Sequence, residues 1–332
     1  NEKKINIKKS NIFFQDESKE TLLIVKLSSA NLFYEGKKLL NQIMIKGKIF
    51  NVPFSLNLNK DLISKNLKSN FKAKELKLKL KDTLNTIDNT ISGYTELSIL
   101  NTNLFYRYNL KNNKIIFKSQ NSTLPNNLIE YQAELNLKPF DFFLNIDLKK
   151  MHIKNFLNKD SIIFELIRSE IFFNENLNLL INLNSSIIQE YKNLKDLKIK
   201  FKIDQGEINL NGSQLLFNKI GSIKLKKSIF SLNEKELVLK GDLHFEDINS
   251  SQFFKFIQLP KKKRIENMNS VIISFNYDFL SEKLRLTDFI IDDLKPSGEI
   301  QNILDNFNSK NNPNNNIYFR NILNKILSDY MG

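Results

Sequence analysis

The stretch "LKDLKIKFKIDQGEINLNGSQLLF", residues 194–217, decides the fold class. From Leu197 to Ile203 every second residue is apolar, every residue between them is lysine, and the alternation resumes after Gly206. Successive side chains of a β-strand point to opposite faces of its sheet, so this pattern predicts a strand with one apolar and one charged face. The apolar face needs a cover, and the nature of that cover bears directly on function.

The same alternation recurs along most of the chain and predicts a mainly β protein. Short polar connections such as "DQGE" (204–207) and "NGS" (211–213) favour antiparallel pairing of neighbouring strands. Strands and helices do not alternate as a parallel sheet would require. Further examples of the pattern are "IMIKGKIF" (43–50), "FSLNLN" (54–59), "LKLKLK" (76–81), "FFLNIDLK" (142–149), "ELVLKGDLHFE" (236–246) and "KLRLTDFIID" (283–292).

Helical periodicity is confined to short segments. Residues 160–168 and 250–259 each begin at an N-cap candidate, Asp160 and then Ser250 or Ser251. A third helix, 316–327, follows the polar stretch 308–316, for which we expect little order. Its apolar residues share one face: Ile322, Leu323, Ile326 and Leu327.

Burial energy makes the cover of the sheet a strong requirement. At about 1.5–3 kcal/mol for each large apolar side chain removed from water, the four apolar residues from Leu197 to Ile203 alone account for roughly 6–12 kcal/mol. The short helices cannot shield so many strands. The sheet must therefore curl on itself, pack on a second sheet or hold a ligand.

Composition narrows the function classes. The net charge is +14, yet the lysines are spread over nearly every predicted strand, whereas nucleic-acid binders gather them in a patch; we expect no nucleic-acid partner. The absence of cysteine excludes disulfides and thiolate chemistry. No run of about 18 apolar residues is present to span a bilayer, so we expect either a soluble protein or a membrane anchor upstream of this sequence.

Catalytic and metal-binding motifs are missing from the sequence. It contains no phosphate-binding loop, nucleophile elbow, zinc-protease motif or EF-hand. The two histidines, His152 and His244, lie in different segments, and His244 shares a polar face with Asp242 and Glu246. The acidic pair Asp292 and Asp293 lies among turn residues. We expect no enzyme, no cofactor and no metal site.

The glycines and phenylalanines of the C-terminal half suggest a family. Gly206, Gly221 and Gly241 open or break successive predicted strands, and a helix carrying Phe253, Phe254 and Phe256 follows. This arrangement resembles the AsmA-like proteins of Gram-negative envelopes. In the N-terminal half, "GKIFNVPFSLNLN" (47–59) and "NFKAKELKLKLKD" (70–82) are similar to the strand pairs of the same family's groove.

The resemblance implies a long, antiparallel, strongly curled sheet that forms an elongated, taco-like groove related to bridge-like lipid transfer proteins. It also implies a periplasmic protein held by an inner-membrane anchor that is absent from this chain, with phospholipid and other envelope proteins as partners and a role in outer-membrane assembly. The residues expected to line the groove are Leu197, Ile199, Phe201, Ile203, Ile208, Leu210, Ile223, Leu225, Leu237, Leu239, Leu243 and Phe245. Four basic residues after Pro260 are candidates for headgroup contacts: Lys261, Lys262, Lys263 and Arg264.

Under this interpretation residues 1–150 form the N-terminal part of the groove. Residues 151–300 form the AsmA-like C-terminal region, with helices near 155–168 and 250–259, and residues 301–332 form a polar linker and a C-terminal helix. Two alternatives stay open: a structural or adhesive β-sandwich or solenoid that binds protein or glycan, and an outer-membrane barrel, which also uses alternating strands. Burial alone does not separate a lipid-lined face from a core, because both remove the face from water.

Overall fold

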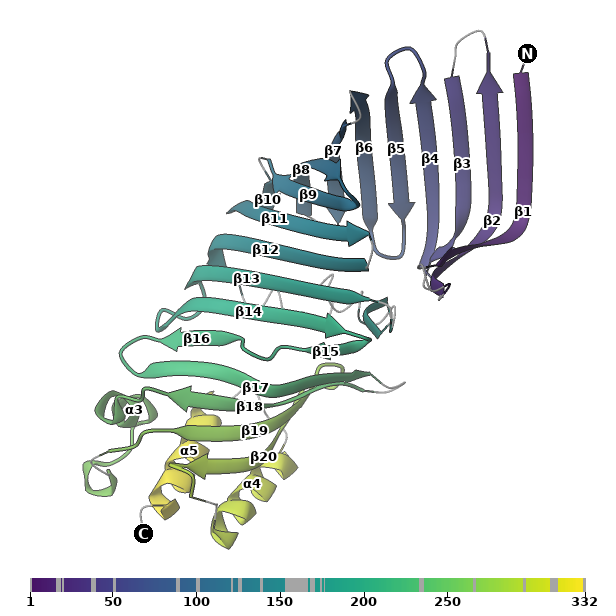
Figure 1. Ribbon diagram of the computed structural model, residues 1–332. Helices are drawn as coiled ribbons and strands as arrows, with labels where there is room; N and C mark the ends of the chain where they lie inside the picture. The colour runs from purple at the N-terminus through teal and green to yellow at the C-terminus, as the bar shows by residue number, and fades with distance from the viewer. Residues whose placement is uncertain are drawn as a thin grey trace. The chain divides into compact units, whose positions relative to one another are not determined.

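The computed structural model describes residues 2–15, 19, 21–36, 40–49, 52–87, 90–99, 102–120, 122–124, 127–137, 140–152, 167, 171–173, 175, 177–232, 236–264, 267–294, 297–310 and 316–330. These residues form 20 strands, β1–β20, and the α-helices α3, α4 and α5 (Figure 1). Every strand pair with a described register is antiparallel. The prediction of a mainly β protein with a curled antiparallel sheet and a C-terminal helix is confirmed.

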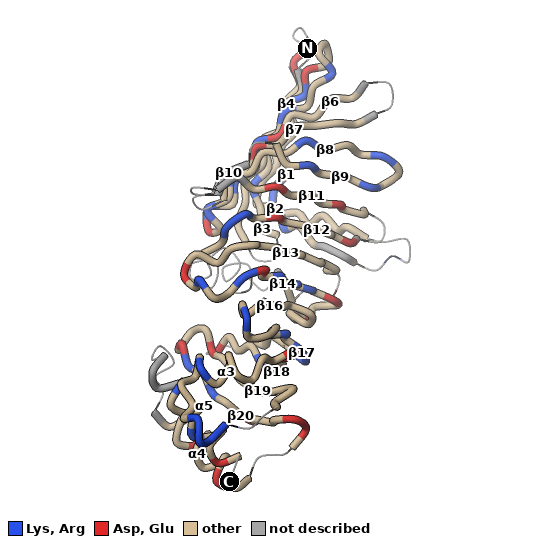
Figure 2. The backbone as a smooth tube through the Cα atoms, turned by 90° about the vertical axis from the view of Figure 1, so that its left-hand side faces the viewer, with Lys and Arg blue, Asp and Glu red and all other residues tan. Residues whose placement is uncertain are grey.

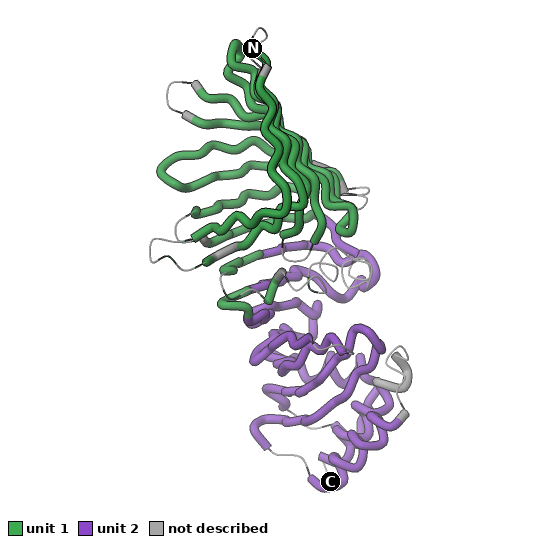
Figure 3. Tube along the Cα trace, turned by 90° about the vertical axis from the view of Figure 1, so that its right-hand side faces the viewer, with its two compact units in different colours: residues 1–149, 155–181, 203–206 green, residues 150–154, 182–202, 207–332 purple. Residues whose placement is uncertain are grey.

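The chain divides into two compact units, coloured in Figure 3. Unit 1 comprises residues 1–149, 155–181 and 203–206, and unit 2 comprises residues 150–154, 182–202 and 207–332.

Unit 1 is an up-and-down succession of long strands. Each strand from β1 to β8 pairs with the next, β9 pairs with β11, and β11 pairs with β12. The short β10 pairs with β8 and β11, as β9 does, so β9 and β10 together make one interrupted strand. The bounds are β1 Glu2–Gln15, β2 Thr21–Glu35, β3 Leu40–Ile49, β4 Val52–Asp61, β5 Asn66–Ala73, β6 Leu78–Ile87, β7 Thr90–Ile99, β8 Thr102–Lys111, β9 Lys114–Ser119, β10 Ser122–Leu124, β11 Asn127–Leu137 and β12 Phe140–Met151.

In unit 2, β14 pairs with β16, and each strand from β16 to β20 pairs with the next. The bounds are β13 Asn178–Ile188, β14 Leu194–Asp204, β15 Glu207–Asn209, β16 Gln214–Phe217, β17 Gly221–Leu232, β18 Leu237–Glu246, β19 Val271–Asp278 and β20 Lys283–Ile291. Strands β12, β13 and β14 each have residues in both units.

The two polar connections of the opening stretch play different parts. Gln205 and Gly206 both have positive φ, 50° and 80°, as a two-residue type I′ hairpin turn requires. "NGS" is not a hairpin connection, and that prediction is wrong. Both β15 and β16 pair with β17 in one continuous register, so residues 210–213 interrupt a single strand.

β-Bulges bend the strands and keep apolar side chains on one face. In β17 the register shifts between Lys226 and Ile229, and Lys227 has a φ of 48°. Because the extra residue changes the phase of the alternation, Leu225 and Phe230 point to the same side of the sheet. Gly241 faces this bulge from β18, where a Cβ atom would lie 3.3 Å from the Ser228 Cα. Comparable register shifts occur in β2 and β14, and they curl the strands locally.

The helices confirm part of the prediction. Helix α3 (Ser250–Ile257) is capped by Asn249, whose side chain accepts a hydrogen bond from the Gln252 backbone N–H, and not by Ser250 or Ser251. Helix α5 (Asn316–Tyr330) confirms the third predicted helix. Helix α4 (Gly298–Lys310) replaces the first part of the expected linker. The predicted helix at 160–168 lies outside the described residues except for Ile167, which is helical and buried.

The helices of unit 2 close a hydrophobic core on the last strands of the sheet. Helix α4 packs on β20 and on α5, and α3 packs on α5. The four apolar residues predicted on one face of α5 are all buried in this core. The core joins side chains from α3, α4, α5, β19 and β20: Phe253, Phe254, Ile257, Ile300, Leu304, Phe307, Ile322, Leu323, Ile326, Leu327, Val271, Ile273, Leu286, Phe289 and Ile291.

Candidate functional site

An apolar surface runs across the strands of unit 1 on one side of the sheet, and we call it the inner face. Its register is continuous from strand to strand, and each residue stands opposite the next in the ladder. One such row, across β3 to β8, consists of Ile45, Leu56, Phe71, Leu80, Leu97 and Leu104. A second row, across β8, β9, β11 and β12, consists of Leu110, Ile115, Leu135 and Phe142.

Most side chains of these rows are partly exposed. Leu80, Leu97, Leu104 and Ile115 are each neither buried nor fully exposed. Within the described residues, the extensive contacts of the unit 1 strands are with strands adjacent in the sheet. The inner face is therefore an apolar surface in partial contact with water, which is a feature of binding surfaces.

The inner face is more tightly packed near β2 and β4. Val25, Leu27, Ala30 and Phe54 are buried there, and the Phe54 ring stacks on Phe71 with 5.5 Å between the ring centroids. At Gly47 a Cβ atom would lie 2.4 Å from the Lys26 carbonyl oxygen, so only glycine fits this close approach of β2 and β3. This part of the sheet supports the more open part of the face.

The inner face ends at β1, which pairs only with β2 among the described residues. Two inward apolar side chains of β1 are strongly exposed, Ile5 at 58% and Phe14 at 52%. Exposed lysines stand along the same strand at positions 3, 4, 8 and 9. Charges of this kind discourage pairing of an open edge with another strand.

The opposite face of unit 1 carries charges of both signs, as the alternation predicts. Figure 2 shows Lys and Arg interspersed with Asp and Glu along the strands. Between β6 and β7 the Lys81 Nζ lies 3.1 Å from the Glu96 Oε2. Both side chains remain partly exposed, so this pair contributes little to stability.

Tyrosines replace aliphatic residues on part of the inner face. The Tyr106 ring packs edge-on against Phe117 and Tyr131, with centroid distances of 5.3 and 6.4 Å. Tyr108 packs against Phe117 at 5.9 Å. Burial raises the pKa of Tyr106 and Tyr108, and for Tyr108 a hydrogen bond to Asp82 raises it further. Both phenols therefore stay protonated at neutral pH.

The structure brings the predicted groove-lining residues, apart from Leu210 in the break after β15, to a common side of β14, β15, β17 and β18, but most of them are well covered. Ile208 and Leu237 are fully buried, and Leu197, Phe201, Ile203, Leu225 and Leu239 are also buried. Ile199 and Leu210 are partly exposed. Ile223, Leu243 and Phe245 pack against the helix-covered core of unit 2, so protein is their immediate neighbour.

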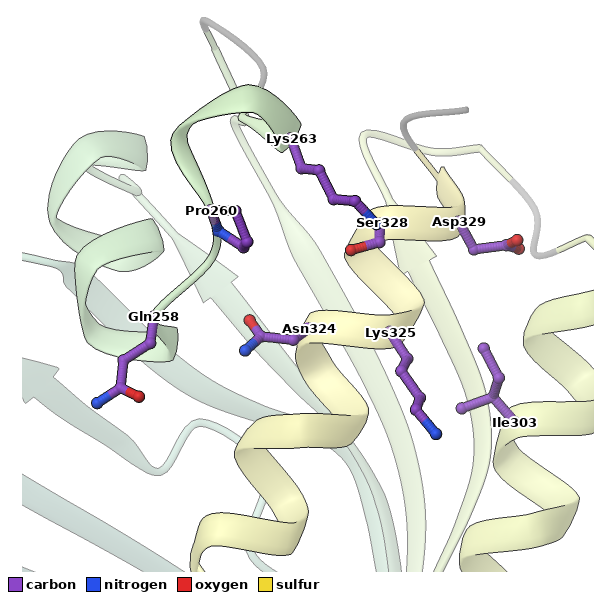
Figure 4. Close-up of a pocket in the computed structure, with 8 residues that line it drawn as sticks. All are labelled: Gln258, Pro260, Lys263, Ile303, Asn324, Lys325, Ser328 and Asp329. Atoms are coloured by element: carbon purple, nitrogen blue, oxygen red, sulfur yellow. The ribbon is translucent and has the colours of Figure 1, made fainter.

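The predicted headgroup residues form an exposed turn after α3. Lys261, Lys262 and Lys263 make a single 3-10 turn and are exposed. Arg264 turns back, and its Nε donates a hydrogen bond to the Leu259 carbonyl at 2.9 Å. Only Lys263 reaches an open pocket that it shares with α4 and α5 (Figure 4), whose other lining residues are Gln258, Pro260, Ile303, Asn324, Lys325, Ser328 and Asp329.

The remaining sequence candidates have local structural roles. His152 lies 3.2 Å from Glu190. The Asp292 Oδ1 accepts hydrogen bonds from the backbone N–H groups of Asn269 and Ser270, at 2.9 and 2.8 Å. In the described part of the chain, no group of three or more His, Cys, Asp or Glu side chains is placed to hold a metal ion.

His244 lies in a charged cluster on the polar side of β17 and β18. Glu246 pairs with Lys226 at 2.9 Å and with Lys224, and Asp242 accepts a hydrogen bond from the Ser274 hydroxyl at 2.7 Å. Burial and the nearby charge of Lys226 lower the pKa of His244, while Asp242 and Glu246 act in the opposite direction. These contacts stabilise the sheet locally.

Comparison with other proteins leaves the family open. No protein-family model matches the chain, and no curated protein matches it. None of the helices in the described ranges combines the length and the apolar character needed to cross a membrane. The AsmA-like resemblance therefore rests on the residues quoted for it.

Sequence reasoning placed the candidate site in the C-terminal half, whereas the more open apolar surface lies in unit 1. Its strands carry the same alternation, for example "LKLKLK" (76–81) and "FSLNLN" (54–59), so the pattern was visible. The sequence does not show that these side chains are more exposed than those of the C-terminal half, because exposure depends on which strands the helices cover.

Proposed function

We propose that the protein is a non-enzymatic envelope protein that holds or conducts phospholipid acyl chains along the inner face of unit 1, in support of outer-membrane assembly. One observation carries the proposal: apolar rows cross the strands of unit 1 and keep most of their side chains in partial contact with water. The location in the periplasm and the inner-membrane anchor rest on the AsmA-like resemblance.

The chemistry of the face favours an acyl chain over a protein segment as its occupant. Within the sheet, backbone N–H and C=O groups are engaged by neighbouring strands, so the face offers them to no ligand. A bound peptide would need partners for its own backbone groups, at a cost wherever they stay unpaired. An acyl chain has no such groups, and each methylene removed from water contributes about 0.8 kcal/mol.

A direct test is native mass spectrometry with lipid extraction, applied to the chain after expression in a bacterial envelope and gentle purification. We expect phospholipid in stoichiometric amount. A lipid-free chain with its full β-structure would contradict the proposal and favour a structural or adhesive function.

Two neighbouring isoleucines on β9 provide a matched pair of variants. Ile115 belongs to the inner face, and Ile116 points to the other face, where it is exposed and stands opposite Glu134. A lysine at position 115 places a charge among acyl methylenes, and losing contact with about two methylenes lowers affinity roughly tenfold.

We therefore expect Ile115→Lys to reduce lipid capture about tenfold, while Ile116→Lys leaves capture unchanged. Circular dichroism and hydrogen exchange of unit 1 establish that both variants fold. Equal capture by the two folded variants would show that the lipid binds elsewhere.

A further inference from the structure

Among the described residues of unit 1, one carboxylate, Asp82, lies among the apolar rows of the inner face. Like Leu78 and Leu80, Asp82 belongs to the residues of β6 that point to the inner face, and it stands opposite Thr95 of β7. Thr95 in turn stands opposite Tyr106 of β8. Asp82 is partly exposed, its neighbour Leu80 on the same face of β6 is aliphatic, and Ser69 of β5 stands opposite it on the other side.

The partners of Asp82 are neutral hydroxyl groups. The Thr95 hydroxyl donates to the Asp82 Oδ1 at 2.6 Å, and the Tyr108 hydroxyl donates to the Oδ2 at 2.8 Å. Thr95 is only 2% exposed. An ionised carboxylate can accept about four hydrogen bonds, so each oxygen keeps capacity for another donor.

In the described part of the chain, no Lys, Arg or His side chain forms an ion pair with this carboxylate. The adjacent Lys81 points to the other face, where it pairs with Glu96. Arg107 likewise belongs to the outward phase of β8 and is exposed.

Aromatic rings stand beside the carboxylate. The Tyr108 ring reaches Asp82 across β7 at Gly93, where a Cβ atom would lie 2.2 Å from the Tyr108 Cζ. Glycine is therefore needed at position 93 for the ring to lie there. Tyr106 and Phe117 continue the aromatic surface on β8 and β9.

A carboxylate with no ion-pair partner among the described residues, bordered by aromatic rings on an apolar surface, suits an ammonium ligand. The carboxylate supplies charge and hydrogen-bond acceptors, and ring faces attract cations through their quadrupole. We propose that Asp82, Tyr106 and Tyr108 bind the ammonium group of an amphiphile whose acyl or alkyl chain lies on the inner face. This inference rests on the proposed function of that face and names the headgroup that the face selects.

The overall positive charge of the protein works against the binding of an ammonium group. With a net charge of +14, the protein attracts anionic amphiphiles in preference to cationic ones. A preference for an amine over a neutral analogue must therefore come from a local site. Selectivity for ammonium is thus a specific signature of the Asp82 site.

The test compares dodecylamine with dodecanol, which share a chain and differ in the headgroup. Each displaces a neutral fluorescent alkyl probe from the full chain, and the ratio of the two affinities is the readout. For the wild type we expect a preference of about tenfold for the amine, as for a partly desolvated cation beside aromatic rings. A ratio near one in the wild type overturns the proposal and needs no variant.

Two variants remove one acidic charge from opposite faces of the sheet. Asp82→Asn keeps a side chain of the same shape, so we expect the amine preference to vanish while dodecanol binding is unchanged. Glu96→Gln is the matched control on β7, and we expect it to keep the wild-type preference. If Asp82→Asn retains the preference, the ammonium site is wrong.

The same measurements separate this inference from the proposed function. If neither dodecylamine nor dodecanol displaces the probe, the acyl-binding face itself is wrong. If both displace it equally, the result supports the acyl-binding face and contradicts the ammonium site. Short-chain phosphatidylethanolamine compared with phosphatidylglycerol then identifies the source: a preference for the ethanolamine lipid assigns the group to a phospholipid, and a preference for dodecylamine alone assigns it to a single-chain amine.

Discussion

The two units make the same kind of sheet and cover it differently. In unit 2 the inward side chains of β19 and β20 are buried under α3, α4 and α5, and Phe289 is completely inaccessible. In unit 1 the corresponding residues of β6 to β9 keep part of their surface in water. Alternation of apolar and polar residues therefore produces a closed core in one unit and an open apolar face in the other.

The difference in cover indicates that the apolar face of unit 2 serves stability, whereas that of unit 1 is available for binding. A helix-covered face gains its burial on folding, whereas a partly exposed face leaves burial for a ligand to complete. In both units the charged side chains lie mainly on the opposite, outward face of the sheet. Two comparisons between the units and one titration within unit 2 test this division.

The largest effect is expected from removing a leucine side chain in each unit. Leu327 of α5 is 0% exposed, so Leu327→Ala leaves a cavity and should cost unit 2 about 2–5 kcal/mol. Leu97 of β7 is partly exposed, and Leu97→Ala should cost unit 1 about 1 kcal/mol. Urea unfolding followed by hydrogen exchange and mass spectrometry measures the two units separately. Equal losses would mean that the inner face is covered as tightly as the core of unit 2.

A smaller effect is expected from adding one methyl group to a glycine in each unit. At Gly93 the added carbon meets the Tyr108 ring, so Gly93→Ala should cost about 1–3 kcal/mol in unit 1. At Gly298, in the first turn of α4, an added Cβ would meet no atom within 4 Å beyond its chain neighbours and the backbone of its own helix, and Gly298→Ala should be neutral or stabilising by up to about 1 kcal/mol. Thermal unfolding measures both variants. An unaffected Gly93→Ala protein would show that the Tyr108 ring does not need the space above β7.

The smallest effect is a pH dependence confined to unit 2. The pKa of His244 in the folded protein lies below its ordinary value of 6.5, so its contribution to stability is complete above pH 6.5 and is lost as the pH falls toward the lowered value. His244→Gln should remove this component. Hydrogen exchange of β18 between pH 5 and about 8 measures it.

Glu246 provides the control for that titration. Its ion pairs with Lys224 and Lys226 lower its pKa below the ordinary 4.5, so its contribution is lost only at more acidic pH. Glu246→Gln should therefore change stability at low pH, and because Glu246 raises the pKa of His244, its loss should enlarge the dependence around pH 6 and not remove it. A wild-type protein without any change near pH 6 would contradict the assignment to His244.

Much of the fold was predictable because strand periodicity is a local property. Helix α4 is an exception: Ile300, Ile303, Leu304 and Phe307 have helical spacing, but the surrounding Asn, Asp and Ser residues are typical of a linker. At residues 210–213 the Asn-Gly pair predicts a hairpin, because it is typical of turns. Its hydrogen bonds to β17 decide otherwise, and those depend on a strand that comes later in the chain.

The Asp82 cluster was beyond reach of sequence reasoning. Tyr108 and Asp82 are 26 residues apart, and only the registers of β6, β7 and β8 bring them within hydrogen-bonding distance. An aspartate in an inward phase was visible as an irregularity of the pattern. The hydroxyl and aromatic partners of this aspartate cannot be identified from the sequence.

By itself the sequence determined that this chain forms antiparallel strands with one apolar and one charged face, because the period of two is written in consecutive residues. It also determined the C-terminal helix, whose apolar stripe recurs every three to four residues. Tertiary structure alone decided which apolar surface the helices bury and which stays open, and that a carboxylate accepts hydrogen bonds from Thr95 and Tyr108 on the open one. Those outcomes depend on contacts between residues far apart in the chain, and local periodicity carries no information about them.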